Sequence, residues 1–391
     1  MKRFVIAAII LALIGAVLYF INQWAADKAS IEIDAILRPK LEAAGAQYES
    51  LSVNPAARQL ILEGVTMEDG IASAEVLSVT TELEDLLAAA EGDLKYLHGL
   101  SVELEGFEYS EYDEAFNLAS GQLDIDGTID LKTMMDAPEV WLQEFFSQEE
   151  AAIDIKGNNF TMNSKEIAEE LGIPSSMVRL EDMVLGLHKS GDDVDAQIEL
   201  NSRDLGNISI SANGDEQTLG SFTMEISEVA FKPERDMSIS IGSSTLSMTG
   251  DIPLATIEEE AWEQLMQDDN ALEWSISVRD FIVEGAELMD EGLPGGRLSI
   301  GSLDHAFKFS GNTLSTTFDF RSNMADGNAE LKWDIQSFEE MAIDVNTMEI
   351  SLDNVMPELR MLLSASPLKP VGDDGYSFSY TGPLSNLIGG R

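Results

Sequence analysis

Strict alternation of apolar and polar residues is the feature that most constrains this chain. In one stretch, Leu100, Val102 and Leu104 alternate with serine and glutamate; in another, Leu123 and Ile125 alternate with aspartate. Because successive side chains of a β-strand point to opposite faces, each stretch predicts a strand with one apolar and one polar face. Such half-solvated strands favour antiparallel hairpins over a parallel sheet, whose buried strands read as continuous apolar runs.

Similar stretches recur to the C-terminus, separated by turn sequences such as SANGD and GLPGG. More than a dozen strands of this kind would expose a large apolar face, so the sheet has to close into a barrel, fold over as a sandwich or curl into a groove. We predict a mainly β fold with short amphipathic helices, in which a long antiparallel sheet curls into a groove or a sandwich after one N-terminal transmembrane helix.

The alternation also identifies candidates for the lining of an apolar groove. Long acyl chains suit such a lining because each buried CH₂ contributes about 0.8 kcal/mol without requiring a polar partner. A filled sandwich core explains the same pattern equally well, and both interpretations stay open. The candidates are large apolar residues of the predicted strands: Leu100, Val102, Leu104, Leu123, Ile125, Phe307, Phe309, Phe318, Phe320 and Phe378.

The charge of the chain limits the classes of partner and chemistry. Its 23 Lys+Arg and 71 Asp+Glu residues give a formal charge of −48, and it has three histidines and no cysteine. So acidic a surface repels phosphate backbones, which argues against nucleic acid as a partner. A thiol nucleophile is excluded, and a histidine-rich metal centre or a Ser-His-Asp triad has few residues available. We therefore predict no enzyme activity, no cofactor, and no catalytic or metal-binding residue.

One segment imitates a catalytic motif. Asp124 and Asp126, with the glycine and threonine that follow, match the Asp-x-Asp-Gly-Thr form of haloacid-dehalogenase-type phosphatases. In those enzymes the motif ends a buried parallel strand, whereas here both aspartates fall on the polar face of an alternating strand. We interpret the motif as a coincidence in a chain rich in aspartate.

The N-terminus predicts a membrane anchor. Residues 4–21 carry no charge and follow Lys2 and Arg3. A helix of this length spans most of a hydrocarbon core of roughly 30 Å. The two cations favour a cytoplasmic N-terminus, with the bulk of the chain on the other side of the membrane. The alternative is a cleaved signal peptide, although the apolar run is long for one and no clean cleavage site follows it.

The rest of the chain divides by its periodicity into segments. We expect a cytoplasmic tip and anchor over residues 1–24, a membrane-proximal helix over 25–46, a first β module over 47–131, a helical insertion over 132–175 and a second β-rich module over 176–391. Candidate capping boxes predict short helices that begin at Thr81, Asp136, Asn163 and Thr256, and a further helix lies near residue 360.

Residues 48–109 resemble a known module. Two short strands, the second with Gly64 and Val65, precede a third with Val76 and Val79, a leucine-rich helix and the strand that contains Leu100. This order is similar to the membrane-proximal module of AsmA-like proteins and related bacterial repeating β-groove families. The resemblance implies an inner-membrane anchor, a periplasmic β-groove and a role in envelope lipid handling or outer-membrane homeostasis.

Two functions are therefore expected. The first is a membrane-anchored periplasmic protein whose apolar β-groove carries phospholipid or another acyl-chain lipid, contributing to envelope lipid transport or outer-membrane assembly. The alternative is a tethered scaffold with a packed β-sandwich that binds an envelope protein, such as a secretion-system component.

Overall fold

The computed structural model describes the greater part of the chain between residues 34 and 388. The segments outside the described residues are 1–33, 36–37, 40, 43–44, 55–57, 68–69, 82–84, 86–94, 112–113, 131–132, 135–136, 164–176, 204–205, 216, 235–236, 254–270, 291–292, 338–341 and 389–391. The predicted membrane anchor and the helices predicted to begin at Asn163 and Thr256 fall in these segments. In the described part, no helix combines the length and the apolar character needed to span a membrane.

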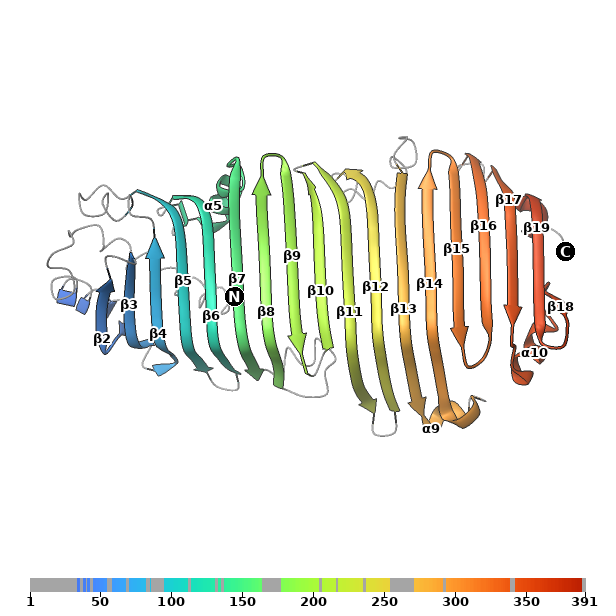
Figure 1. Ribbon diagram of the computed structural model, residues 1–391, viewed down its shortest axis with the longest axis horizontal. Coiled ribbons are helices and arrows are strands. Elements are labelled where there is room, and N and C mark those ends of the chain that lie inside the picture. The colour runs from blue at the N-terminus through green and yellow to red at the C-terminus, as the bar shows by residue number, and fades with distance from the viewer. Residues whose placement is uncertain are drawn as a thin grey trace. The chain divides into compact units, whose positions relative to one another are not determined.

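Two compact units divide the chain, Met1–Arg203 (unit 1) and Asp204–Arg391 (unit 2). In each unit the described strands form an antiparallel sheet, coloured blue to green for unit 1 and yellow-green to red for unit 2 in Figure 1. The prediction of a mainly β, antiparallel fold with few short helices is confirmed. No second sheet packs face to face on either one among the described elements, so the sandwich arrangement is not found there.

Unit 1 consists of nine strands and one complete described helix: β1 (Ala46–Gln47), β2 (Ser50–Asn54), β3 (Gln59–Met67), β4 (Ala72–Thr81), β5 (Tyr96–Glu111), β6 (Glu114–Asp130), α5 (Pro138–Phe145), β7 (Glu150–Asn163), β8 (Met177–Ser190) and β9 (Asp193–Ser202). From β2 to β9 each strand pairs with the next in sequence, and β1 pairs with β3.

Unit 2 consists of ten strands and four short helical segments: β10 (Gly206–Asp215), β11 (Thr218–Glu234), β12 (Met237–Pro253), β13 (Ala271–Gly285), α9 (Ala286–Asp290), η2 (Pro294–Gly296), β14 (Arg297–Ser310), β15 (Thr313–Ser322), β16 (Asp326–Ser337), β17 (Ala342–Asp353), α10 (Pro357–Leu363), β18 (Lys369–Val371), β19 (Gly375–Pro383) and α11 (Leu384–Ile388). Strands β10 to β17 pair in sequence order, and β19 pairs with both β17 and β18.

The segment 132–175, expected as a helical insertion, contributes a helix and also a strand. Helix α5 begins at Pro138 after Ala137, which forms no side-chain cap, so the capping box predicted at Asp136 does not begin the helix. Proline at the first helical position has no N–H to leave unpaired, which explains the start there. Strand β7 follows because Ala151, Ile153 and Ile155 alternate with polar residues and continue the apolar face of β6.

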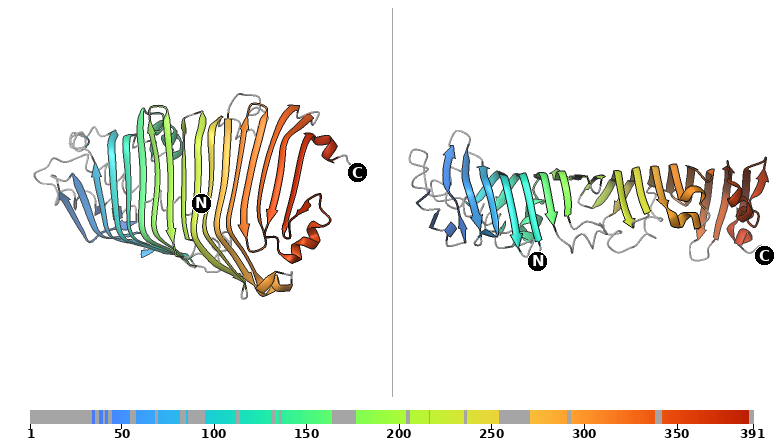
Figure 2. Two further views of the ribbon diagram at one scale, coloured as in Figure 1. Left: turned by 45° about the vertical axis from the view of Figure 1, so that its right-hand side comes forward. Right: turned by 90° about the horizontal axis from the view of Figure 1, so that it is seen from below.

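Positive-φ residues interrupt several strands without changing their register. They are Gly64 in β3, Gly106 in β5, Asn159 in β7, Glu228 in β11 and Asp280 in β13. Each is missing from the ladder, and the pairing resumes beyond it in the same register. The left view of Figure 2 shows the yellow and orange strands of unit 2 bending towards their lower ends.

The largest core lies in unit 1, on the apolar face of β3 to β6. Leu41 from the helical residues before β1 and Trp141 and Phe145 from α5 are buried in one cluster with the apolar side chains of these strands. Phe145 lies beside Gly127, where an added Cβ would come within 2.9 Å of its ring. The amphipathic helices thus cover the sheet's apolar face at this end of unit 1, as their pattern predicts.

Candidate functional site

Strand registers place apolar side chains of unit 2 in continuous rows across one face of its sheet. Each row has nine residues, one from each of β10 to β17 and one from β19, and neighbouring members lie directly opposite each other. The upper row is Ala212, Phe222, Met248, Trp274, Phe307, Thr316, Leu331, Met348 and Tyr380. The middle row is Ile210, Met224, Leu246, Ile276, His305, Phe318, Ala329, Ile350 and Phe378. The lower row is Ile208, Ile226, Ser244, Val278, Leu303, Phe320, Gly327, Leu352 and Tyr376.

These three rows, called the unit 2 apolar face below, contain no lysine, arginine, aspartate or glutamate. Every residue of the middle row is half-buried, and Trp274 in the upper row is 36% exposed. A core between two layers would bury such side chains almost completely. Much of this apolar face is therefore left uncovered by the residues that the structure describes.

At the β19 end of this face, a helix supplies partial cover. Val355, just before α10, is buried with Ala325 and Tyr376, and Leu359 and Leu363 of α10 pack against this cluster. The other side of α10 exposes Met361 and Leu362. The predicted helix near residue 360 is confirmed, and its inward residues cover an edge of the unit 2 apolar face.

Aromatic rings meet near the centre of the unit 2 apolar face. The ring of Trp274 lies with its centroid 5.6 Å from those of His305 and Phe307, in edge-to-face geometry. The rings of His305 and Phe318 are 6.2 Å apart, and those of Phe318 and Phe320 are 5.5 Å apart. Edge-to-face aromatic pairs favour each other beyond their buried area. We call Trp274, His305, Phe307, Phe318 and Phe320 the aromatic cluster.

The unit 1 apolar face has similar rows but a gradient of burial. One row runs from β2 to β9 through Val53, Leu60, Val79, Val102, Leu123, Ile155, Leu185 and Ile198. Leu60, Val79 and Val102 are buried beneath the helical cover, whereas the members on β6 to β9 are half-buried. An apolar surface therefore remains accessible on β6 to β9.

The ten predicted lining residues fall into two groups, five in unit 1 and five in unit 2. Leu100, Val102 and Ile125 are buried in the unit 1 core, and Leu104 and Leu123 pack against it partly buried. These five lie beneath or beside the helices of unit 1, because the helices cover that part of the sheet.

The five phenylalanines all lie on the apolar side of the unit 2 sheet. Phe307, Phe318 and Phe320 meet in the aromatic cluster, Phe378 closes the middle row, and Phe309 is buried beyond the upper row. Sequence reasoning did not select Trp274 or His305, although both alternate in phase with residues of these strands, His305 with Phe307 and Phe309. Their two-residue spacing was the sign that could have identified them.

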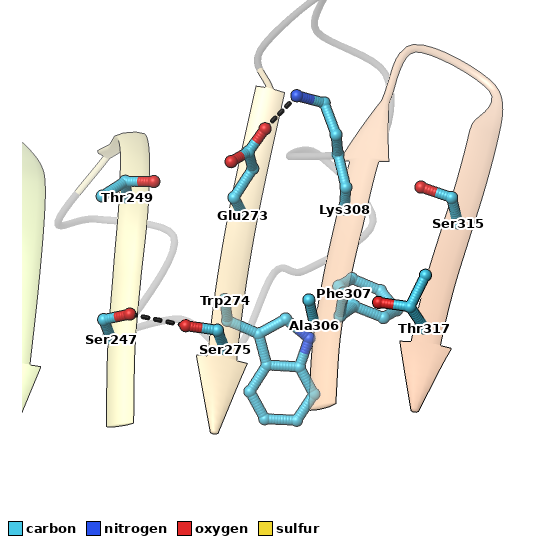
Figure 3. A pocket seen from close by; sticks show the side chains of 10 residues that line it. All are labelled: Ser247, Thr249, Glu273, Trp274, Ser275, Ala306, Phe307, Lys308, Ser315 and Thr317. Atoms are coloured by element: carbon cyan, nitrogen blue, oxygen red, sulfur yellow. Dashed lines mark hydrogen bonds and ion pairs between the residues drawn. The ribbon is translucent and has the colours of Figure 1, made fainter. Parts of the chain in front are cut away.

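On the opposite face, β12 to β15 carry small hydroxyl side chains, which line a hollow of about 310 Å³ together with Trp274 and Phe307 of the upper row. Figure 3 shows the lining residues in two rows, with Glu273 bonded to Lys308 in one and Ser247 bonded to Ser275 in the other. The serine hydroxyls lie 2.7 Å apart. Because no imidazole or free carboxylate contacts these hydroxyls among the lining residues, the hollow can form hydrogen bonds but has no base to activate a nucleophile.

The phosphatase-like motif lies in the middle of unit 1's sheet. Asp124 is directly opposite Asp154 of β7, and the Gln122 amide donates a 2.8 Å hydrogen bond to Asp124. Strand β6 is antiparallel to both of its neighbours, so it does not form the parallel strand end that the phosphatase chemistry requires. Among the described residues, no cluster of three or more histidine, aspartate or glutamate side chains is arranged to hold a metal ion.

One histidine–aspartate pair has a structural role. Asp85 is buried and accepts a 2.6 Å hydrogen bond from the backbone N–H of His98, while its other oxygen lies 2.7 Å from the His98 ring Nδ1. Thr81 Oγ1 donates a 2.8 Å hydrogen bond to the carbonyl of Gly99 beside this pair. These bonds attach Asp85, in the connection from β4 to β5, to the start of β5.

A search of protein-family models finds no match for this chain, and neither do searches of curated proteins and of solved structures. The functional argument therefore rests on the residues and the geometry above.

Proposed function

We propose that this protein is a membrane-anchored periplasmic protein that binds acyl-chain lipid on the apolar faces of its sheets and contributes to envelope lipid transport or outer-membrane assembly. The observation that supports this proposal is the uncharged, half-buried unit 2 apolar face. An acyl chain needs apolar contact and no polar partner, so it fits a face without charged residues.

The length of the face suits this ligand. Strands in a sheet lie about 4.8 Å apart, so a row of nine residues extends roughly 40 Å across unit 2, longer than an extended phospholipid acyl chain. The charge of −48 disfavours a second copy of the chain as the occupant, because two strongly negative molecules repel each other. The resemblance of residues 48–109 to AsmA-like proteins supports the placement in the inner membrane with the sheets in the periplasm.

Lipid bound to the protein after extraction tests the proposal. The full chain is extracted in a mild detergent and analysed by native mass spectrometry for co-purifying phospholipid. We expect stoichiometric lipid on the wild-type protein and at least a fivefold lower occupancy on the Phe318→Asp variant, because a carboxylate in the middle row is costly to bury against a hydrocarbon chain.

Thr317→Asp is the matched control, since Thr317 neighbours Phe318 on β15 but lines the hollow of the opposite face. It is expected to keep wild-type occupancy. Absence of lipid from the wild-type protein would overturn the proposal and favour the scaffold alternative. Equal losses in both variants would show that the added charge, and not the apolar face, controls occupancy.

A further inference from the structure

Two hydrogen-bonded polar side chains interrupt the unit 2 apolar face. Apart from the tyrosines of β19, the three rows contain only Ser244, His305 and Thr316 as polar residues. His305 Nε2 lies 2.9 Å from Thr316 Oγ1. The pair therefore forms a hydrogen-bonding position near the centre of a surface whose other side chains there are hydrocarbon and aromatic.

The surroundings of this pair are apolar on the face where it lies. Ile276 is directly opposite His305 on β13 and Phe318 is directly opposite on β15, while the Trp274 ring meets the imidazole edge to face. The charged groups of these strands lie on the other face: Asp304 with Arg279, Lys308 with Glu273, and Asp319. His305 is thus the only titratable side chain of β13 to β15 in the three rows.

We infer that His305 and Thr316 bind the carboxyl group of a long-chain fatty acid whose hydrocarbon chain lies along the unit 2 apolar face. This inference rests on the proposed lipid-binding function and names the ligand class. A single imidazolium matches the single charge of a carboxylate. Its Nε2–H donates to Thr316 Oγ1, so the donors left for the carboxylate are the Nδ1–H and the threonine O–H. A phosphate headgroup favours arginine or lysine partners, and the three rows contain none.

The proton balance predicts a pH dependence. Histidine is the side chain whose charge changes between about pH 5 and 8. A fatty acid carboxylate binds the imidazolium form, so the affinity for the acid falls as the pH is raised across this range. An alcohol with the same chain has no such requirement and binds independently of pH.

The test compares 9,10-dibromostearic acid with 9,10-dibromostearyl alcohol on the full chain in a mild detergent. Bromine quenches tryptophan fluorescence at short range, so Trp274 reports occupancy of the face, and a Trp274→Phe variant defines the signal from the other tryptophans. At pH 6 we expect the wild-type protein to bind the acid roughly tenfold more tightly than the alcohol. At pH 8 this preference is expected to disappear.

The His305→Phe variant retains an aromatic ring in the cluster and removes the titratable group. It is expected to bind acid and alcohol alike at both pH values. Thr317→Val, on the opposite face of β15, is the control and retains the wild-type preference. Circular dichroism confirms that each variant is folded.

The outcomes separate the two proposals. If the alcohol quenches Trp274 but the acid shows no preference at pH 6, or if His305→Phe retains the preference, the carboxyl site is overturned while lipid binding stands. If neither ligand quenches Trp274 in the wild-type protein, both the carboxyl site and the lipid-binding face are overturned.

Discussion

At the scale of single residues, Gly64 in β3 has a backbone conformation that favours glycine. Gly64 has a φ of +62°, and a Cβ added there would lie 2.6 Å from Cγ of Glu49. A left-handed conformation costs an L-residue roughly 1–2 kcal/mol, and the clash adds to it. We expect Gly64→Ala to lower the free energy of unfolding by about 2–3 kcal/mol, measured by urea denaturation.

Gly191→Ala is the matched control, because Gly191 has a φ of +63° with nothing within 4 Å of an added Cβ. It should show only the conformational cost of roughly 1–2 kcal/mol. Adding Glu49→Ala to Gly64→Ala is expected to recover the steric part. A Gly64→Ala protein as stable as the wild type would show that neither the positive φ nor the contact with Glu49 constrains this position.

A buried tyrosine makes the attachment of the N-terminal helical residues sensitive to pH. Tyr48 donates a 2.9 Å hydrogen bond to Asp34, and the Arg38 guanidinium lies 4.4 Å above its ring. Burial, together with the bond to Asp34, raises the pKa of the Tyr48 hydroxyl. The hydrogen bond from Arg38 lowers the pKa of Asp34, and the bond from Tyr48 adds to this effect.

Both shifts define a pH window for stability. Because the pKa of Tyr48 is raised in the folded state, the stabilisation that its hydroxyl gives the fold is complete below about pH 10, the pKa of an unfolded tyrosine. This stabilisation is lost at higher pH. Because the pKa of Asp34 is lowered in the folded state, the stabilisation that its carboxylate gives the fold is present above about pH 4 and is lost in acid. Wild type is expected to exceed Tyr48→Phe by about 1 kcal/mol at pH 7, with a smaller difference at pH 11 and pH 3. A difference that stays constant from pH 3 to pH 11 in urea denaturation would contradict this assignment.

At the scale of elements, helix α5 packs Trp141 into the unit 1 core, and the effect of this side chain on stability can be measured by substitution. Trp141 is buried, and its Nε1–H has no hydrogen-bond partner among the described residues. A buried unpaired donor costs about 1–3 kcal/mol, so replacing the indole with an apolar ring removes that cost while losing some contact area. Trp141→Phe is expected to change the free energy of unfolding by less than about 1 kcal/mol.

Trp141→Ala removes the ring itself and is expected to cost about 3–5 kcal/mol. Urea denaturation of the two variants side by side measures the difference. A similar loss in both would mean that the indole N–H contributes to stability and would contradict the assignment of Trp141 as a packing residue.

The strands were the most predictable elements, because alternation specifies both the conformation and the face. Phe307 and Phe318 therefore share a face as expected. Helix limits were less predictable: Asp136 is a good capping residue in isolation, yet the helix begins after Ala137, where Pro138 suits the first turn. Local patterns compete at helix ends, and the geometry of the connecting segments decides between them.

At the scale of the whole molecule, the net charge affects the stability of the folded state. At a net charge of −48, self-repulsion opposes the folded state. The screening length falls from about 30 Å at 0.01 M salt to about 3 Å at 1 M. We expect the unfolding temperature to rise by roughly 5 °C or more over this range in calorimetry, since 1 kcal/mol corresponds to about 2–4 °C for units of this size. A melting temperature that is flat or falls in NaCl would contradict this prediction.

The candidate site could be predicted only in part. The sequence identifies apolar faces, but which part of a face a helix covers depends on long-range packing. Leu100 and Phe318 have the same alternating context, yet Leu100 is buried in the unit 1 core and Phe318 stays half-buried. The proximity of His305 to Thr316 depends on the register between β14 and β15, which single-strand patterns do not specify.

Because most strands of unit 2 pair with their neighbours in sequence, whole hairpins can be added to or removed from its sheet. Strands β11 to β16 each bond to the preceding and the following strand, so most contacts of this sheet are between chain neighbours and the ladder can form from any hairpin. Duplication or deletion of one complete hairpin would leave every other ladder in register. A gene encoding such a sheet can therefore adjust its width in steps of two strands, as linear repeat proteins adjust theirs by whole repeats.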